Sequence, residues 1–286
     1  MRSRPLRGLA LLLLSALLLL AGGSCSGYPS AGTLNSTVDA GGATAVAASF
    51  RLNHGRLKIS GGASSLMRGA FLTDDKYDPS VTYSVHNQQG SLAVTQTGTR
   101  SGFSMIPTDS SWTVNLNDEI PLDLAVENGG AHLDLNLDTL TITRLALDVG
   151  GGSASISLNG VQREFSAVQL NATSGDVDLH MRGSYDQPRV IDATTISGSL
   201  TLDLGGASAA GLTGSIRSTS GGITISIPRE TGVKIEASTT SGTINANGLI
   251  EKSNGTYVNS AYGTSKTTVS LEVRSTSGPI TFKFAS

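Results

Sequence analysis

The stretch VQLNATSGDVDLH, residues 168–180, joins two runs of alternating apolar and polar residues through Thr173-Ser174-Gly175. Alternation with period two is typical of β-strands that bury one face. Equivalent corners follow at Ile196-Ser197-Gly198, Thr219-Ser220-Gly221, Thr240-Ser241-Gly242 and Thr276-Ser277-Gly278. The five serines are 23, 23, 21 and 36 residues apart, which is the length of a supersecondary unit. The second half of the chain is therefore predicted to consist of repeats.

Each repeat carries the same apolar positions on both sides of its serine. Three and five residues after the serine come Val177/Leu179, Leu200/Leu202, Ile223/Ile225, Ile244/Ala246 and Ile280/Phe282. Four and six residues before it come Leu170/Val168, Ala193/Ile191, Ile216/Gly214, Ala237/Ile235 and Val273/Leu271. Each repeat is predicted to be a strand, a Ser-Gly corner and a second strand. The glycine would supply positive φ or a tight corner, and the serine hydroxyl would satisfy a backbone group at the bend.

Repeats of about 22 residues with inward aliphatic side chains favour stacked coils. The predicted fold class is therefore all-β, a single-stranded, β-helix-like β-solenoid. Weaker copies of the repeat extend it toward the N-terminus at residues 127–135 and 149–156. The longer spacing before the last copy predicts a protruding loop or hairpin from Leu249 to Ser265.

The N-terminus has the features of an export signal. Arg2, Arg4 and Arg7 precede an apolar run at residues 9–21 that is shorter than the ~20 residues of a membrane-spanning helix. Cys25, the single cysteine, follows directly and resembles the lipidated cysteine of a bacterial lipobox, with Gly22 where that pattern prefers Leu. Lipidation at Cys25 is predicted, and the alternative is ordinary cleavage near Gly23-Ser24 followed by secretion.

Charge and composition limit the classes of partner. Removal of residues 1–24 would leave 17 basic and 22 acidic groups, so nucleic-acid binding is not expected. The predicted organisation is a signal peptide at 1–24, a lipidated flexible tether at 25–48, an N-terminal β domain at 49–160 and repeats at 161–286. The tether prediction rests on the abundance of Gly, Ala, Ser and Thr.

Two segments resemble known families. The first half contains HGRLKISGG at residues 54–62, WTVNLN at 112–117 and LALDVG at 145–150, and it resembles the bacterial toast-rack domain. The repeats from about residue 165 resemble the related family labelled putative adhesin. The resemblance implies β-solenoids on the outer side of bacterial membranes, related to LiaF-type cell-wall stress regulators, and a non-enzymatic envelope module. LiaF-type regulators carry several membrane helices before this domain, whereas here only the signal precedes it.

No catalytic, cofactor-binding or metal site is predicted from the motifs. The four histidines, His54, His86, His132 and His180, are scattered singly, and the common serine-enzyme signatures are absent. His132 and His180 are expected on the surface as outward neighbours of Asp134 and Asp178. Trp112 is expected to pack under the early coils. An acidic stripe on one outer face is the basis of an enzyme hypothesis, and its members would be Asp134, Asp138, Asp148, Asp176, Asp178, Asp192 and Asp203.

The sequence thus predicts a non-enzymatic, lipid-anchored envelope protein without cofactors, which presents a rigid β-solenoid surface for binding or scaffolding. A role in envelope stress response is one possible setting. The alternatives are an adhesin for external surfaces and a β-helical carbohydrate-active enzyme. Expected partners are the membrane, through the N-terminal lipid, and an envelope protein or wall component. A homo-oligomer through terminal solenoid strands is also expected, because the coil containing Phe282 and Phe284 comes last in the chain.

Overall fold

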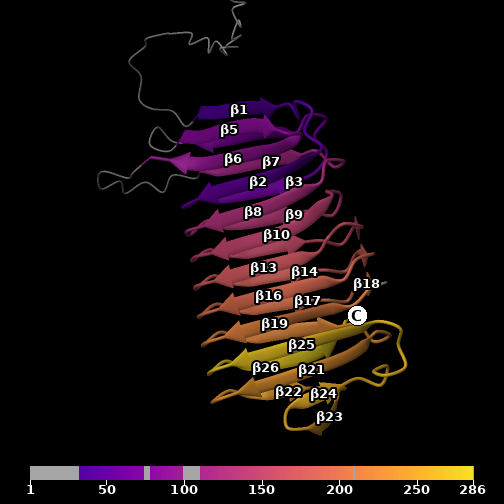
Figure 1. The fold of residues 1–286 in the computed structure, drawn as a ribbon. Coiled ribbons are helices and arrows are strands. Elements are labelled where there is room, and N and C mark those ends of the chain that lie inside the picture. The colour runs from indigo at the N-terminus through magenta and orange to yellow at the C-terminus, as the bar shows by residue number, and fades with distance from the viewer. Residues whose placement is uncertain (1–31, 74–77, 99–109, 209, 286) are drawn as a thin grey trace, which may run out of the picture.

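A computed structural model describes residues 32–73, 78–98, 110–208 and 210–285. These residues form an all-β solenoid and contain no helix. Their strands stack as rungs into two long sheets, here called sheet A and sheet B, that face each other (Figure 1). Three short strands form a further sheet, sheet C. The predicted fold class is confirmed.

The strands appear here in spatial order, so that neighbours are hydrogen-bonded. Sheet A consists of β1 (Gly32–Val38), β4 (Met67–Thr73), β7 (Ser111–Leu116), β3 (Arg56–Ser60), β9 (His132–Asn136), β11 (Ala154–Ser157), β14 (Val177–His180), β17 (Leu200–Asp203), β20 (Ile223–Ile227), β26 (Ile280–Phe284) and β22 (Ile244–Ala246). Sheet B consists of β5 (Asp78–His86), β6 (Gln89–Thr97), β2 (Ala45–Leu52), β8 (Leu122–Asn128), β10 (Ile142–Val149), β13 (Ala167–Ala172), β16 (Arg189–Thr195), β19 (Leu212–Ser218), β25 (Thr268–Ser275), β21 (Gly232–Thr239), β24 (Thr256–Val258) and β23 (Ile250–Ser253). Sheet C consists of β12 (Val161–Gln162), β15 (Ser184–Tyr185) and β18 (Ala207–Ser208).

One coil is a strand of sheet B, a corner and a strand of sheet A. In the coil of β13 and β14, the inward residues Val168, Leu170, Val177 and Leu179 are at most 2% exposed, while Asp178 points to solvent. Burial of such a side chain contributes about 1.5–3 kcal/mol. Successive coils pair in parallel and in register, so their inward residues merge into one hydrophobic core that runs along the stack. The predicted alternation is confirmed.

The corner glycines are required for close stacking rather than for positive φ. None of the glycines in the Ser-Gly corners lies in the left-handed region. A Cβ on Gly175 would lie 1.9 Å from the carbonyl oxygen of Gly152, and a Cβ on Gly198 would lie 1.9 Å from that of Gly175. The contact repeats at Gly221, Gly278 and Gly242. Each corner therefore rests directly on the backbone of its neighbour.

The hydroxyl that donates a hydrogen bond to a backbone carbonyl at the bend is not the one expected. Ser218 Oγ donates to the Gly221 carbonyl at 2.5 Å, and Ser275 Oγ donates to the Gly278 carbonyl at 2.7 Å. Both hydroxyls are buried, whereas the repeated serines Ser220 and Ser277 are exposed. The prediction for the repeated serines is therefore wrong, because the inward residue two positions earlier lies against the corner. The repeated serines contribute backbone instead, as in the bond from Ser220 N to the Ile196 carbonyl at 2.8 Å.

Coil order in space departs from chain order at both ends. The coil of β2 and β3 lies between the coil of β6 and β7 and that of β8 and β9. The last segment of the chain, β25 and β26, lies between β19–β20 and β21–β22. The C-terminus consequently lies beside the stack and not at its lower end (Figure 1). The expectation that Phe282 belongs to a terminal coil is wrong, since β26 pairs with β20 on one side and with β22 on the other, and Phe282 is fully buried.

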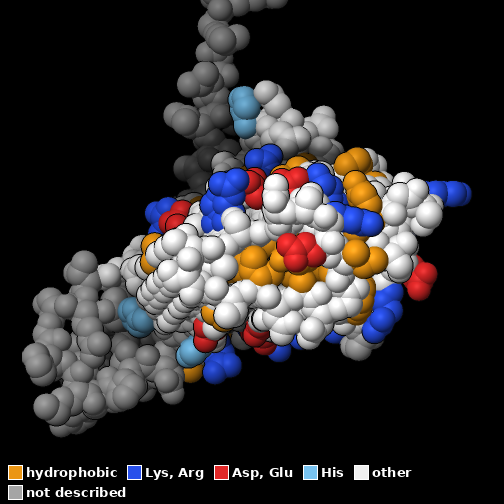
Figure 2. All heavy atoms as spheres, turned by 90° about the horizontal axis from the view of Figure 1, so that it is seen from below, with side chains coloured by type: hydrophobic (Ala, Val, Ile, Leu, Met, Phe, Trp, Pro, Cys, Tyr) orange, Lys and Arg blue, Asp and Glu red, His pale blue; other side chains and the backbone are white. Residues whose placement is uncertain are grey.

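The lower end of the stack is formed by β22 and by a hairpin. Strands β23 and β24 pair antiparallel with each other, and β24 pairs antiparallel with β21, which confirms the hairpin expected between Leu249 and Ser265. The inward residues Ile244 and Ala246 of β22 are only half-buried. Figure 2 views this end along the stack and shows apolar side chains in its middle with an acidic side chain over them, and both basic and acidic side chains around the rim.

The N-terminal segments differ from expectation where they are described. Strand β1 pairs antiparallel with β4, and β2 begins at Ala45, so residues 32–48 are not a flexible tether. The signal peptide and Cys25 lie outside the described residues. Trp112 is fully buried and meets Phe71 edge-on at 5.2 Å between ring centroids, as expected.

The two sheets continue across the expected domain division at residue 160. Before residue 160, β10 pairs with β8 and β11 pairs with β9. The same two strands, β10 and β11, also pair with β13 and β14, which follow residue 160. The two halves therefore form one continuous solenoid, and a division into two domains stays a prediction.

Candidate functional site

A row of side chains at the ends of four adjacent strands of sheet B forms the strongest candidate site. The in-register pairing of β16, β19, β25 and β21 aligns Thr194, Arg217, Arg274 and Ser238. These positions alternate with buried ones, so the four side chains point outward. Adjacent strands are about 4.8 Å apart, and the row therefore places two guanidinium-bearing side chains on neighbouring rungs. The row lies at the arrowhead ends of these strands in Figure 1.

The corners that follow these strands complete an open groove of about 480 Å³, here called the arginine groove. Its lining consists only of two arginines and nine hydroxyl-bearing residues. They are Thr194, Thr195, Arg217, Ser218, Thr219, Ser238, Thr239, Thr240, Arg274, Ser275 and Thr276. The buried hydroxyls of Thr195, Ser218 and Ser275 are bonded to corner carbonyls, so the groove has a fixed floor.

Glu272 connects the two arginines. Its carboxylate lies 3.4 Å from Arg217 Nη2 and also pairs with Arg274 Nη2. The arginine side chains are 52% and 61% exposed, while that of Glu272 is 35% exposed. A guanidinium has five N–H donors, so each arginine keeps donors for a ligand. The groove can thus bind an anion by charge and a hydroxyl-rich molecule by hydrogen bonding.

Charged groups beside the groove are paired with each other. Lys234 Nζ donates to Glu236 Oε1 at 2.7 Å, and this bond holds the pKa of Glu236 below its usual range. The same contact raises the pKa of Lys234. These two charges offset each other, and the row next to the two arginines carries Glu272 and the exposed Asp192. The capacity of the groove to bind an anion therefore rests on the guanidinium donors and not on a net positive charge.

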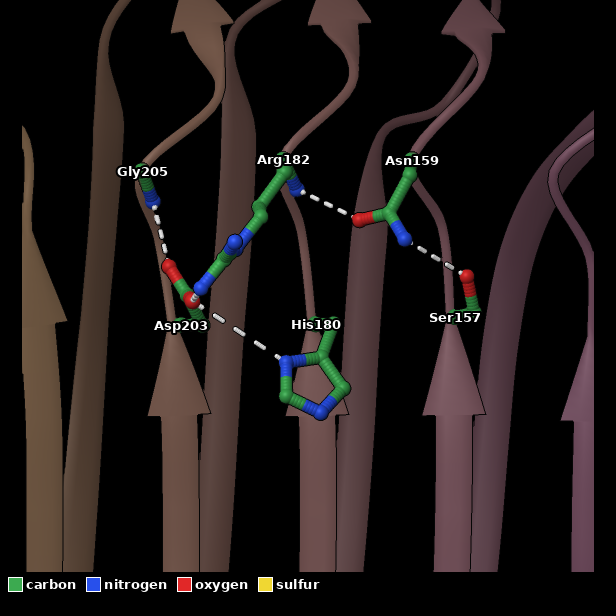
Figure 3. A network of polar contacts seen from close by, with 6 residues as sticks. All are labelled: Ser157, Asn159, His180, Arg182, Asp203 and Gly205. Atoms are coloured by element: carbon green, nitrogen blue, oxygen red, sulfur yellow. Dashed lines mark hydrogen bonds and ion pairs between the residues drawn. The ribbon is translucent and has the colours of Figure 1, made fainter. Parts of the chain in front are cut away.

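A second polar cluster lies at and just beyond the C-terminal ends of the adjacent strands β11, β14 and β17 of sheet A (Figure 3). The nearly buried Asp203 accepts from Arg182 Nε at 2.6 Å and from the Gly205 amide at 3.0 Å. His180 Nδ1 lies 3.9 Å from the same carboxylate. The cluster continues through Asn159, which accepts from the Arg182 amide and donates to Ser157 Oγ. These contacts connect three successive coils, so their role is to hold the stack together.

The expected acidic stripe on one face is not formed. Asp134 and Asp178 point outward from sheet A, whereas Asp148 and Asp192 point outward from sheet B. The other three acids serve local structure: Asp138 and Asp176 accept backbone amides of the next coil, and Asp203 pairs with Arg182. Chain neighbours were expected on one face, but consecutive strands belong alternately to the two sheets.

The histidines lie apart from one another, as expected. His132 is exposed on β9 and its Nδ1 lies 2.8 Å from Ser153 Oγ, while His180 meets Asp203 of the next coil rather than Asp178. His54 lies in the bend after β2 and His86 ends β5. Among the described residues there is no cluster of three or more His, Cys, Asp or Glu suited to a metal ion. The described part of the chain also contains no helix long and apolar enough to cross a membrane.

The arginine groove was missed at the sequence level, although a signal was present. Arg217 and Arg274 occupy the same repeat position, three residues before the corner serines Ser220 and Ser277. One other repeat separates them along the chain, so their contact requires the rearranged order of the last two coils.

The fold and groove define a parallel β-solenoid with an open groove of polar lining. A comparison with protein families matches residues 29–180, more than half of the chain, to the family described as the N-terminal domain of toast_rack, DUF2154. The chain belongs to this toast-rack family. The match begins before residue 49 and ends after residue 160, the limits expected for this domain.

Solved structures of similar proteins come from several bacteria. A putative cell adhesion protein from Clostridium sporogenes is 24% identical, with 90% of this chain and 100% of that chain covered and a TM-score of 0.47. A putative adhesin from Bacteroides fragilis is 10% identical, covers 89% and 98% of the two chains and has a TM-score of 0.40. A putative adhesin from Parabacteroides distasonis is 8% identical, with 88% and 97% covered and a TM-score of 0.37. The comparison with curated proteins gave no match.

Proposed function

We propose that this protein is a non-enzymatic binding or scaffolding module of the bacterial cell envelope, held at a membrane by a lipid on Cys25. The observation that carries the proposal is the continuous solenoid, which presents outward rows of short polar side chains on a well-packed core. Because each coil within the stack pairs with two neighbours, such a surface is rigid before it meets a partner, and less entropy is lost on binding.

Lipid anchoring is supported by the sequence of the first 25 residues. The basic start, the short apolar run and the immediately following Cys25 fit export and lipidation. Cys25→Ala should abolish incorporation of labelled palmitate and move the protein from the membrane fraction to the soluble fraction. Membrane retention of the unlabelled variant would contradict lipid anchoring, and a Ser26→Ala variant provides the control.

The binding role is tested by capture from native envelopes. A photo-crosslinking amino acid is placed in turn at Thr219 in the arginine groove and at Thr224 on the outer face of sheet A. Reproducible capture of one envelope protein or wall component would support a binding or scaffolding role, including a role in stress response. Failure of both positions to capture any envelope component would contradict it.

Two other functions are distinguished by the same preparation. An adhesin would bind to external surfaces when the protein is displayed on cells, and the Thr219 and Thr224 probes would then capture host or surface material. A β-helical carbohydrate-active enzyme is less well supported, because the acids that suggested it lie on two different sheets. Polysaccharide cleavage by the purified protein would restore that alternative.

A further inference from the structure

We propose that the arginine groove binds a segment of an anionic glycan, a polymer that carries carboxylate or phosphate groups among hydroxyl groups. The inference rests on the proposed binding role and adds the chemical class of the ligand. Two features carry it: the pair of arginines on adjacent rungs and the lining made otherwise only of Ser and Thr.

The arginines match the anionic groups. Guanidinium groups bind carboxylate and phosphate through two parallel N–H···O bonds, and such charge-assisted bonds are about twice as strong as neutral ones. Arg217 and Arg274 come from paired strands and are both more than half exposed, so both reach solvent on the same side of sheet B. The single carboxylate of Glu272 already bridges the two arginines, and a polymer with successive charges can give each arginine an anionic group of its own.

The length of the row favours an extended ligand. Thr194, Arg217, Arg274 and Ser238 lie on four consecutive rungs and so extend about 14 Å along the stack. Hydroxyl groups lie at both ends of this row and along the adjoining corners at Thr219, Thr276 and Thr240. They can donate to and accept from the hydroxyls of a sugar polymer over its whole length.

The same lining argues against other polyanions and against a protein partner at this site. Single-stranded nucleic acids are usually bound by aromatic side chains that stack on bases, and the groove lining has none. Protein interfaces usually depend on buried aromatic or aliphatic anchors, which the lining also lacks. A hydroxyl-rich anionic polymer fits both the two arginines and the Ser and Thr residues of the lining.

Glu272 acts as an internal competitor for the ligand. The Glu272 carboxylate pairs with the Nη2 atom of each arginine, and Glu272 lies on β25 beside the groove. Removal of its charge should free these donors and lower the repulsion felt by an anion. The inference therefore predicts opposite effects from adjacent residues: affinity falls when the arginines are neutralised and rises when Glu272 is neutralised.

Binding of purified protein is measured by calorimetry with three probes: poly(glycerol phosphate), polygalacturonate and neutral dextran. The first two separate the phosphate and carboxylate sources of the charge, and dextran tests hydroxyls alone. We expect binding of at least one anionic polymer, no binding of dextran and weakening with added salt. Failure of both anionic polymers to bind, or equal binding of dextran, would overturn the inference.

The variants locate the binding. Arg217→Gln with Arg274→Gln should lower affinity at least about tenfold, since two charge-assisted contacts are lost. Glu272→Gln should raise affinity several-fold. Arg144→Gln, an exposed arginine of β10 paired with Asp123 at 3.4 Å, is the matched control and should bind like the wild type. Unfolding midpoints confirm that each variant is folded. Wild-type affinity in the double arginine variant would overturn the inference.

The outcomes also separate this inference from the proposed function. Capture of an envelope component only from Thr224 on sheet A, with no polymer bound in the groove, would leave the proposed function standing and reject the glycan. Polymer binding that depends on Arg217 and Arg274, in a protein that captures nothing from envelopes, would support the glycan site and contradict the proposed function.

Discussion

At the residue scale, one glycine triplet contains both a position that excludes a side chain and a position that admits one. A Cβ on Gly152 would lie 1.7 Å from the Ala131 carbonyl oxygen, whereas a Cβ on Gly151 would lie 3.7 Å from the nearest atom, the Gly129 carbonyl oxygen. The difference arises because the corner backbone of one coil rests on that of the next. Two adjacent and chemically identical substitutions should therefore have different effects.

Gly152→Ala is expected to lower the free energy of unfolding by about 1–3 kcal/mol or more, since backbone must move to admit the methyl group. Gly151→Ala should change it by less than about 0.5 kcal/mol, as for ordinary surface substitutions. Urea denaturation of the two variants measures the difference. Equal midpoints would contradict the close stacking of the corners.

A second matched pair separates the buried hydroxyl of the corner from the exposed one. Ser218→Ala removes the bond to the Gly221 carbonyl and should lower the free energy of unfolding by about 1–3 kcal/mol, because a buried acceptor loses its donor. Ser220→Ala, at the exposed corner serine, should leave the unfolding midpoint nearly unchanged. Thermal unfolding of both variants provides the test, and a larger loss at Ser220 would restore the sequence-based expectation.

The bidentate pair of Arg51 and Glu127 gives stability a dependence on pH. Arg51 Nε and Nη2 donate to the two oxygens of Glu127 at 2.6 and 2.8 Å, and this contact holds the pKa of Glu127 below the ordinary value of 4.5. Since the folded-state pKa is lowered, the contribution is present above pH 4.5 and is lost as pH falls through the folded-state value. The pair is exposed, so the effect should be small.

Glu127→Gln should accordingly lower the urea midpoint slightly at about pH 7, and its difference from the wild type should shrink below about pH 4.5. The exposed Asp192 on the same sheet supplies the control variant, Asp192→Asn. A difference between wild type and Glu127→Gln that grows as the solution is acidified would contradict the assignment.

At the element scale, the position of a strand in the stack, rather than its position in the chain, should decide how easily it opens. Strand β25 is close to the C-terminus, yet it pairs with β19 on one side and β21 on the other. The hairpin of β23 and β24 comes earlier in the chain and forms the edge of sheet B. Edge elements have fewer buried contacts and open at lower free energy than central ones.

Hydrogen exchange measured by mass spectrometry should therefore find slower exchange in residues 268–275 than in residues 250–258. The usual expectation for a C-terminal segment is the opposite, because chain ends fray. Fast exchange of the β25 amides, at the rate of the hairpin, would contradict the insertion of the last coil between its two neighbours.

At the scale of the whole molecule, the two ends of the stack are the places where strands could add. Sheet A ends at β1 and β22, and sheet B ends at β5 and β23. Unpaired strand edges are natural sites of association. Association through terminal strands stays a proposal, but it now concerns β22 and β23 in place of the C-terminal strand.

Light scattering at tens of micromolar should report a mass above that of one chain if the ends associate. Ile250→Lys on β23, where the wild-type side chain is 51% exposed, should then return the mass of a monomer. Val161→Lys on sheet C, where the side chain is 63% exposed, is the control and should not. A monomeric wild type would contradict association through the ends.

Much of the fold could be predicted from local pattern alone. The alternation around Ser174 and its copies sets which side chains face inward, because successive residues of a strand point to opposite faces whatever the partner strand is. The regular spacing of the corners sets the length of a coil, and the residues from Leu249 to Ser265 could not form part of a regular coil because they exceed that length. These properties are local, so no neighbour is needed to define them.

Only the tertiary structure decided which coils are neighbours. Parallel, in-register pairing accepts any coil of matching length. The repeat pattern alone therefore does not show whether the coil of β25 and β26 lies at the end of the stack or between two earlier coils. That insertion places Arg217 beside Arg274 and creates the arginine groove. Likewise, Asp203 reaches Arg182 because successive coils lie one strand spacing apart. The sequence by itself determined the rungs and their inward faces, whereas pairing between distant segments decided their order and the site.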